Sequence, residues 1–324
     1  MRALITGGAG FIGSHLGDAL LARGDSVIAL DNLATGRHDN IREHIGDPRF
    51  EFVLGSIINA DLVDDVVARS DVVYHLAAAV GVKLIVERPL ESLVTNIRGS
   101  EVVLEKAHKY GKKVLLTSTS EIYGKSPSVP MHEDSDRLLG SPLVGRWSYS
   151  TSKAVDEILA HAYWKAKGLP TVIVRLFNTV GPRQSPQFGM VLPRFIESAL
   201  DGRELTVHGD GSQSRCFGHV RDVVPALIAL MECREAEGLA VNLGSQEEVS
   251  VLRLAELVIE RTGSPSTIRM VPYQQVYVGG FEDMPRRVPD TSRARKLIGF
   301  EPSTSLVEII DSMVDDARRR RWLR

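Results

Sequence analysis

The sequence is poor in cysteine and has neither a strong charge excess nor a long apolar run. The two cysteines among its 324 residues, Cys216 and Cys233, lack metal-ligand spacing and are expected to be reduced structural thiols. A net charge of −2 gives no indication of nucleic acid or a membrane surface as a partner, and no apolar stretch reaches the ~18 residues of a membrane span. The N-terminus enters a strand without a basic, cleavable leader. These absences predict a cytoplasmic protein with no metal.

The first 180 residues alternate short β-branched runs with longer segments of helical spacing. The runs that indicate strands are RALIT, SVIAL, EFVL, DVVYHLA, KKVLLTS and TVIVRLF. The segments with helical spacing are 12–23, 59–69, 91–110 and 148–167. Nearly continuous apolar strands between amphipathic helices predict an α/β fold with a Rossmann-type, doubly wound parallel sheet.

The pattern changes after residue 180. The loop GPRQSPQFG leads into a short helix, MVLPRFIESALDG, and a short strand, ELTVHG. The helix HVRDVVPALIALMEC and the strand LAVNLG then return to the sheet. We therefore expect residues 1–180, joined by 219–245, to form the Rossmann domain. Residues 181–218 and 246–324 would form a smaller, discontinuous C-terminal lobe.

The segment ITGGAGFIGSHL, between the first strand and the first helix, predicts a dinucleotide site. Gly7, Gly10 and Gly13 allow a tight turn, close approach to a pyrophosphate and close packing of helix on strand. The helix N-terminus then offers free N–H groups to the phosphates. Asp31, at the end of the second strand, can accept both ribose hydroxyls of NAD and would repel the extra phosphate of NADP. Arg37 follows closely and leaves NADP as an alternative.

Tyr149 and Lys153 stand at i and i+4 of a predicted helix, so they share a face. A phenol is a poor base at neutral pH because its pKa is near 10. A neighbouring ammonium and a cationic nicotinamide favour the phenolate, which could then take a proton from a sugar hydroxyl. A helix can carry this spacing by chance, but the glycine loop upstream favours a catalytic pair.

Polar residues crowd the carboxyl end of the strand KKVLL, in TSTSEIYG. Thr119, Ser120 and Glu121 there are poor core residues and good site residues. Glu121 could instead cap a loop or pair with a cation such as Lys125. His75 is expected to be a packed strand-end residue, and the RRRR run near the C-terminus a solvated helix end.

A series of motifs follows in order along the chain: TGGAGFIGSHL, HLAA, the Tyr149/Lys153 pair, VRLFNTVGPRQ, LTVHGDGSQSRCF, HVRDVV and VNLG. Together these motifs resemble the extended short-chain dehydrogenase/reductases that act on nucleotide sugars. The resemblance implies an NAD-dependent enzyme, a UDP-linked substrate and a homodimer formed through helices near 91–110 and 148–167. The implied cofactor residues are Gly7, Gly10, Phe11, Ile12, Gly13, Asp31, Asn32, Leu76, Ala77, Ala78, Asn96, Tyr149 and Lys153. The implied substrate residues are Thr119, Asn178, Arg215 and Arg287, with Arg215 on the diphosphate.

The strand-end motif sorts the chemistry in this family. Thr119-Ser120-Glu121 is similar to the Thr-Ser-Glu of UDP-glucuronate decarboxylases and GDP-mannose 4,6-dehydratases. The segment RRVPDTSRARKLIGFEP is similar to the decarboxylases' Arg-x-Pro-Asp segment, which precedes a Gly/Asp-Trp-Glu-Pro turn. In this comparison Arg287 corresponds to their active-site arginine. UDP-glucuronate 4-epimerases carry an arginine where this chain has Ser185. Ser56, Lys125 and the loop AAAVGVKLIVERP depart from the usual pattern.

The resemblance implies oxidation at C4 of UDP-glucuronate followed by decarboxylation at C5, giving a UDP-4-keto-pentose, UDP-xylose or both. The implied catalytic residues are Tyr149, Lys153, Thr119, Ser120, Glu121 and Arg287. Glu121 would position the sugar for the C5 chemistry and Arg287 would guide protonation. The alternatives are a UDP-sugar 4-epimerase, an NDP-hexose 4,6-dehydratase and a non-catalytic NAD-binding sensor.

Overall fold

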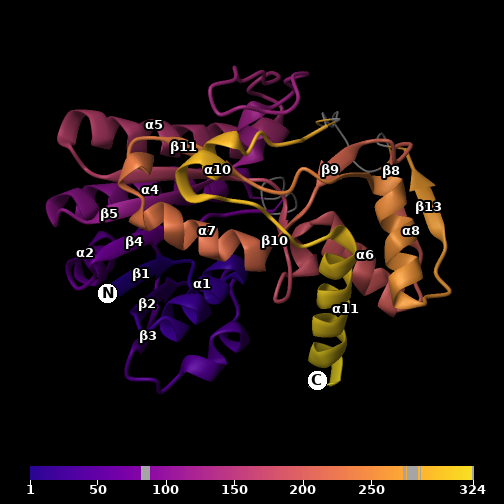
Figure 1. Cartoon of the computed structure of the whole chain (residues 1–324), viewed down its shortest axis with the longest axis horizontal. Helices are drawn as coiled ribbons and strands as arrows, with labels where there is room; N and C mark the ends of the chain where they lie inside the picture. The colour runs from indigo at the N-terminus through magenta and orange to yellow at the C-terminus, as the bar shows by residue number, and fades with distance from the viewer. Residues whose placement is uncertain (82–87, 273–274, 276–283, 285, 323–324) are drawn as a thin grey trace.

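The computed structural model describes residues 1–81, 88–272, 275, 284 and 286–322, and within them a seven-stranded sheet forms the centre (Figure 1). Its strand order is β11-β6-β5-β4-β1-β2-β3, and every neighbouring pair is parallel. The strands are β1 (Arg2–Thr6), β2 (Ser26–Asp31), β3 (Phe50–Leu54), β4 (Val72–His75), β5 (Lys113–Thr119), β6 (Thr171–Leu176) and β11 (Ala240–Leu243). The predicted doubly wound parallel sheet is confirmed.

Helices cover both faces of this sheet. They are α1 (Phe11–Ala22), α2 (Ala60–Ala68), α4 (Pro89–Lys109), α5 (Ser148–Lys167) and α7 (Val220–Glu232). On one face, Leu16 of α1 and Leu227 of α7 share a core with Ile5 of β1. On the other, helices α2, α4 and α5 bury residues such as Val103 against Leu116 of β5. Apolar side chains on both faces of each strand explain why the strand segments are so uniformly hydrophobic.

The C-terminal lobe has a separate core. Its helices are α6 (Val191–Leu200), α8 (Val251–Thr262) and α11 (Leu306–Trp322), which pack around Leu192, Leu254 and Ile309. β8 (Leu205–His208) pairs in parallel with β13 (Ile268–Val271), and β9 (Ser214–Cys216) pairs antiparallel with β12 (Glu248–Ser250). β7 (Thr179–Val180) pairs with β10 (Gly218–His219) at the point where the chain passes between sheet and lobe.

Short elements complete the part of the chain that the structure describes. They are α10 (Ser292–Ile298) and the 3-10 turns η1 (His38–Asn40), η2 (Arg42–His44), η3 (Ser120–Tyr123), η4 (Gly145–Trp147), η5 (Pro186–Phe188) and η6 (Arg234–Ala236). α10 falls in the segment expected to belong to the lobe, yet Ala294 and the following Phe300 pack into the sheet core with α7 and β11 (Figure 1). Among the described helices, none is both long and apolar enough to cross a membrane.

Candidate active site

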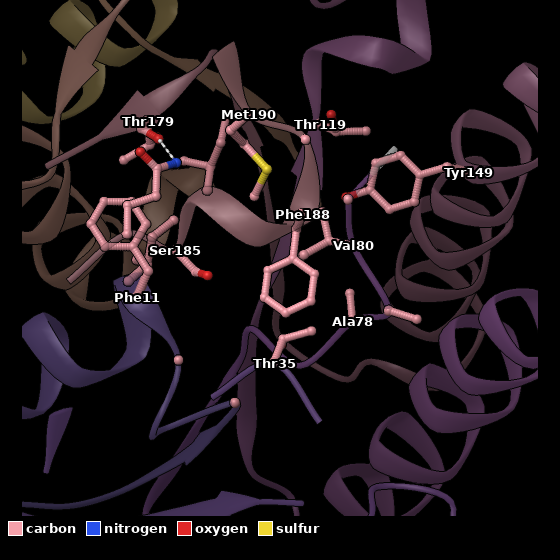
Figure 2. Close-up of a pocket in the computed structure, with 18 of the residues that line it drawn as sticks. Phe11, Thr35, Ala78, Val80, Thr119, Tyr149, Thr179, Ser185, Phe188 and Met190 are labelled. Atoms are coloured by element: carbon pink, nitrogen blue, oxygen red, sulfur yellow. Dashed lines mark hydrogen bonds between the residues drawn. The ribbon is translucent and has the colours of Figure 1, made fainter. Parts of the chain in front are cut away.

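A cavity of about 680 Å³ runs along the carboxyl ends of the parallel strands and continues between the sheet and the C-terminal lobe. This is the edge at which open α/β sheets bind ligands. Figure 2 shows Phe11 and Thr35 from the dinucleotide half on the same pocket as Thr119 and Tyr149, with Phe188 and Met190 nearby. One continuous space therefore joins the predicted cofactor and sugar residues.

The glycine loop is built for close approach of another group. Gly7 has φ +74°, a conformation that a residue with a side chain rarely adopts. A methyl group on Gly13 would overlap the Gly7 carbonyl oxygen, so the start of α1 packs directly on the loop backbone. The residues of this loop that line the cavity are Gly7, Gly10, Phe11, Ile12 and Gly13. The loop and the N-terminus of α1 fit the pyrophosphate of a dinucleotide.

Asp31 lies at the end of β2 on the cavity wall, beside Asn32. Its two carboxylate oxygens accept hydrogen bonds from the backbone N–H groups of Ala9 (3.0 Å) and Leu33 (2.8 Å). Burial raises the pKa of this carboxyl above its usual value, and the backbone hydrogen bonds oppose that rise. The side chain is therefore oriented from two sides and faces the space where a ribose would lie.

The segment after β4 is held by residues that do not themselves reach the cavity. Leu76, Ala77 and Ala78 line it, but Asn96 lies behind them on α4 and is 1% exposed. The Asn96 amide accepts a hydrogen bond from the Ala79 N–H at 2.7 Å and donates to the Ser152 hydroxyl at 3.1 Å. Asn96 thus ties this segment to helix α5 and positions it.

His75 is packed at the end of β4, as expected. Its Nδ1 is 2.8 Å from the Thr6 hydroxyl and its Nε2 is 3.1 Å from the Ser100 hydroxyl. Burial, helped by the charge of Lys153, lowers its pKa from 6.5 to about 3, so the ring is neutral near pH 7. His75 joins β1, β4 and α4 beneath the cavity.

Tyr149 and Lys153 lie on one face of α5, and both line the cavity with Thr119. In Figure 2 the Tyr149 ring points from its helix into the pocket, on the side where Thr119 ends β5. Burial raises the pKa of the Tyr149 phenol, the charges of Glu121 and Asp156 raise it further, and a hydrogen bond with Thr119 lowers it. The Lys153 ammonium donates to Asp156 at 2.7 Å. The geometry suits a base that needs a nearby cation before it ionises.

Glu121 does not pair with the cation suggested by its neighbourhood in sequence. Its carboxylate receives two hydrogen bonds from Arg146, at 2.5 and 3.1 Å, and lies 3.7 Å from the Arg287 guanidinium. The Lys125 ammonium instead lies 5.9 Å from the Trp147 ring centroid. All three members of the Glu121–Arg146–Arg287 cluster line the cavity and are largely buried. The sequence pattern gives no indication of a role for Arg146, although this residue stands only three positions before Tyr149.

A buried polar network lies under the turn that carries Glu121. The Tyr123 hydroxyl donates to the Asn242 amide oxygen at 2.7 Å and receives a hydrogen bond from Arg175 at 3.0 Å. Arg175 also forms a two-pronged salt bridge with Glu157 on α5. Since buried groups in a satisfied network have few alternative positions, η3 is held rigidly against β6, β11 and α5.

The substrate-side residues reach the cavity from both domains. Asn178 lines it with an unusual φ of +36°, and its amide donates to the Cys216 carbonyl at 2.9 Å. Arg215 on β9 is 7% exposed and also lines it, so it is not a surface arginine. Ser185 lines the same wall, and its hydroxyl accepts the Gln187 N–H at 3.3 Å.

The departures from the family pattern lie on the same cavity where the structure describes them. Ser56 lines it near Ile57. Residues 82–87 of the loop AAAVGVKLIVERP lie outside the described residues, whereas Ala79, Val80 and Gly81 are on the wall. Arg37 also lines the cavity and lies 3.8 Å from Asp39.

Comparison with known proteins decides the family. Residues 4–313 match the family described as GDP-mannose 4,6 dehydratase. The chain belongs to this family. It is therefore one of the NAD-dependent extended short-chain dehydrogenase/reductases, and an enzyme.

Individual members of this family give the range of chemistry. A UDP-N-acetyl-alpha-D-glucosaminuronate decarboxylase of Bacillus cytotoxicus is 42% identical, with 94% of each chain covered. A UDP-glucuronic acid decarboxylase 1 of Xenopus tropicalis is 38% identical over 98% of this chain and 72% of its own. The structure of a UDP-glucuronic acid 4-epimerase of Bacillus cereus, solved with UDP-glucuronic acid and NAD, is 30% identical in sequence and has a TM-score of 0.89. The match covers 99% of this chain and 100% of the epimerase chain.

Proposed function

We propose that the protein is an NAD-dependent decarboxylase of a UDP-linked hexuronate, either UDP-glucuronate or its 2-acetamido counterpart. The observation that carries this proposal is the Glu121–Arg146–Arg287 cluster beside Tyr149. Two guanidinium groups, those of Arg146 and Arg287, line this part of the cavity. Guanidinium groups suit carboxylates in geometry and charge, so a sugar that brings its own carboxylate fits this wall of the cavity. Two curated relatives with decarboxylase names, at 42% and 38% identity, support the same reaction.

NAD would lie along the glycine loop, with its ribose at Asp31 and its nicotinamide end toward Tyr149 and Lys153. When bound, it supplies the acceptor for a hydride from C4 of the sugar and can return that hydride later. Lys153 would hold the second ribose, the one next to the nicotinamide, and its charge would favour the Tyr149 phenolate. The carboxylate of Asp31 disfavours the extra phosphate of NADP, although Arg37 lines the same cavity.

The first chemical step is oxidation at C4. The Tyr149 phenolate takes the proton from the C4 hydroxyl, the C4 hydride departs, and the C4 carbon becomes a ketone. Thr119 orients the same hydroxyl through its contact with Tyr149. Ser120, buried at the start of η3, fixes the turn between Thr119 and Glu121.

The second step breaks the bond between C5 and the carboxylate. CO2 leaves, and the electron pair of that bond is held as an enolate on the new C4 ketone. Glu121 positions the sugar and Arg287 guides the proton that then adds to C5. Return of hydride to C4, with the proton from Tyr149, gives UDP-xylose or its 2-acetamido analogue; release before that gives the 4-keto pentose. Asn178 and Arg215 hold the nucleotide side, with Arg215 on the diphosphate.

The 4-epimerase alternative needs only Tyr149, Lys153 and Thr119, and a 30% identical structural relative has that activity. Ser185 speaks against it for a uronate, because no guanidinium at that position would retain the carboxylate. A 4,6-dehydratase would use Glu121 to remove water across C5 and C6. A non-catalytic sensor would have no need for the Tyr149 and Lys153 pair.

The protein acts as a cytoplasmic homodimer through α4 and α5. These helices pack side by side, and their outer faces expose Leu90 (74%), Val94 (47%) and Ile158 (65%). Exposed large apolar side chains on adjacent helices are typical of an interface. Cys216 and Cys233 are not joined in a disulfide, in keeping with a reducing compartment.

The proposal is tested by incubating the purified protein with NAD and each of UDP-glucuronate, its 2-acetamido counterpart, UDP-glucose and GDP-mannose. Products are identified by mass spectrometry. Loss of one CO2 from a uronate supports the proposal, and a product two hydrogens lighter than the pentose identifies the keto form. An unchanged mass with a new C4 epimer by NMR, or loss of water from a hexose, would replace it.

A further inference from the structure

Arg146 is a buried charge at the active site that forms two hydrogen bonds with the Glu121 carboxylate. It lies in η4, three residues before Tyr149 on a turn that runs directly into α5, and is 9% exposed. Both terminal nitrogens donate to the two oxygens of Glu121, and its guanidinium carbon lies 5.6 Å from the Trp147 ring centroid. A planar guanidinium held by two parallel hydrogen bonds fixes its partner in orientation as well as position.

The charge of Glu121 matters at Tyr149. After burial, Glu121 is the next cause that raises the pKa of the Tyr149 phenol, followed by Asp156. Lys153 on α5 and Arg287 from the C-terminal segment also line the cavity. Lys153 is itself paired with Asp156, and Arg287 is 3.7 Å from Glu121 against 2.5 Å for Arg146. Of the two described arginines that contact Glu121, Arg146 is therefore the nearer.

We propose that Arg146 is a positioning residue that fixes the Glu121 carboxylate and offsets its negative charge beside the Tyr149 hydroxyl. The inference rests on the proposed function only in taking Tyr149 as the base. It explains how a carboxylate for C5 chemistry can stand next to a phenol that must ionise. In this proposal the charges of Arg146 and Glu121 largely cancel at Tyr149. The Glu121 carboxylate remains available to accept hydrogen bonds from the sugar.

The test is an ultraviolet titration of the Tyr149 phenol in the NAD complex without any sugar. Each protein is compared with the same protein carrying Tyr149→Phe, so that the other tyrosines cancel. Arg146→Gln should raise the titration midpoint by about one pH unit, and Glu121→Gln should lower it. The double variant should return to within about half a unit of the wild type, since both charges are then absent.

Two further variants separate charge from structure. Arg146→Lys keeps the charge and loses the two-pronged geometry, so it should keep the midpoint near the wild type but slow CO2 release. Arg137→Gln is the matched control, because Arg137 contacts the same turn through the Ile122 carbonyl at 3.1 Å. It should leave the midpoint unchanged. Thermal melting and NAD binding of each variant show that the fold is retained.

Unchanged midpoints in both single variants would overturn the inference, as would a shift in Arg146→Gln that persists in the double variant. If Arg146→Gln does not fold, Arg146→Lys and Glu121→Gln still test the proposed role of Arg146. The absence of a downward shift of the Tyr149 midpoint in Glu121→Gln would contradict that role. Because no sugar is present, these outcomes are independent of the product analysis. The protein could fail as a decarboxylase and still show the shifts, or the reverse.

Discussion

The Lys153 ammonium and the Asp156 carboxylate form a 2.7 Å hydrogen-bonded ion pair that is almost completely shielded from solvent. The pair lies within one to two turns of Tyr149 on α5, so the lysine is held at the cavity rather than extended into water. Burial raises the pKa of Asp156, and the Lys153 charge opposes that rise. The proposed base thus has a cation of fixed position as its neighbour.

Replacing Tyr149 by Phe should reduce turnover by about a thousandfold, because general base catalysis is lost. NAD affinity should change by less than about threefold, since the ring remains and only one hydroxyl is removed. Sugar-dependent NADH formation and calorimetric NAD binding measure the two quantities. Full activity in Tyr149→Phe would remove the base assignment.

Gly13→Ala should weaken NAD binding by about a hundredfold. The added methyl would overlap the Gly7 carbonyl, and overpacking of this kind costs up to about 3 kcal/mol. Gly17→Ala is the matched control on the same helix, because its methyl would meet only the Ile5 side chain, at 3.9 Å. That variant should bind NAD normally and be slightly more stable. Equal NAD binding by both variants would contradict the proposed cofactor position.

The parts of this site that were predictable are local in sequence. The glycine loop follows a strand and opens a helix, and Tyr149 and Lys153 are one helical turn apart, so periodicity alone brings them together. Arg146 reaches Glu121 across 25 residues, and its contact depends on how η4 packs against η3. The network of Tyr123, Asn242 and Arg175 joins the turn η3 to the strands β11 and β6 and, through Glu157, to helix α5. No short-range pattern encodes such contacts.

The same reasoning applies to the smaller lobe. Its strands β7, β9, β10 and β12 have only two or three residues each, too few to show an alternating pattern. The placement of α10 on the sheet core follows from Ala294 and Phe300, which bury against α7 and β11 after the chain has already crossed the lobe. The change of sequence pattern after residue 180 predicts a second unit but does not indicate which of its helices packs on the sheet.

Glu121→Ser should impair CO2 release more than C4 oxidation. The oxidation needs Tyr149 and NAD, whereas the C5 step needs the sugar held against the Glu121–Arg146–Arg287 cluster. We expect about a hundredfold loss in CO2 release and at most a few-fold loss in the first reduction of NAD in a single turnover. Stopped-flow NADH absorbance and trapped CO2 measure the two steps. An equal loss in both would argue against a special role in the second step.

Ser185→Arg should slow decarboxylation while leaving oxidation in place. Ser185 lines the cavity, and a guanidinium there could hold the substrate carboxylate and oppose its departure as CO2. We expect CO2 release to fall about tenfold or more, with a 4-epimer or 4-keto uronate detectable by NMR. Ser185→Ala is the control, because it removes the hydroxyl that caps η5 without adding a charge. Equal effects of the two variants would make the change structural.

His75 should make the fold sensitive to acid. The unfolded chain takes up this proton near pH 6.5, but the folded protein does so only near pH 3, so the stabilisation is complete above 6.5 and is lost as the pH falls toward 3. The contribution is about 1.4 kcal/mol per pH unit inside that window. Urea unfolding of wild type and His75→Gln at several pH values should show a shallower acid slope in the variant. Parallel slopes would contradict a neutral, buried His75.

The most direct test of the account uses UDP-glucuronate and its 2-acetamido counterpart, each labelled with a heavy isotope at the carboxyl carbon. The labelled sugar is incubated with NAD and either wild type or Tyr149→Phe, and the gas and the nucleotide product are analysed together. We predict that wild type releases the label as CO2 and leaves an unlabelled UDP-pentose or its 4-keto form, and that Tyr149→Phe releases none. Label retained in a UDP-uronate with inverted C4 would contradict the account and identify an epimerase.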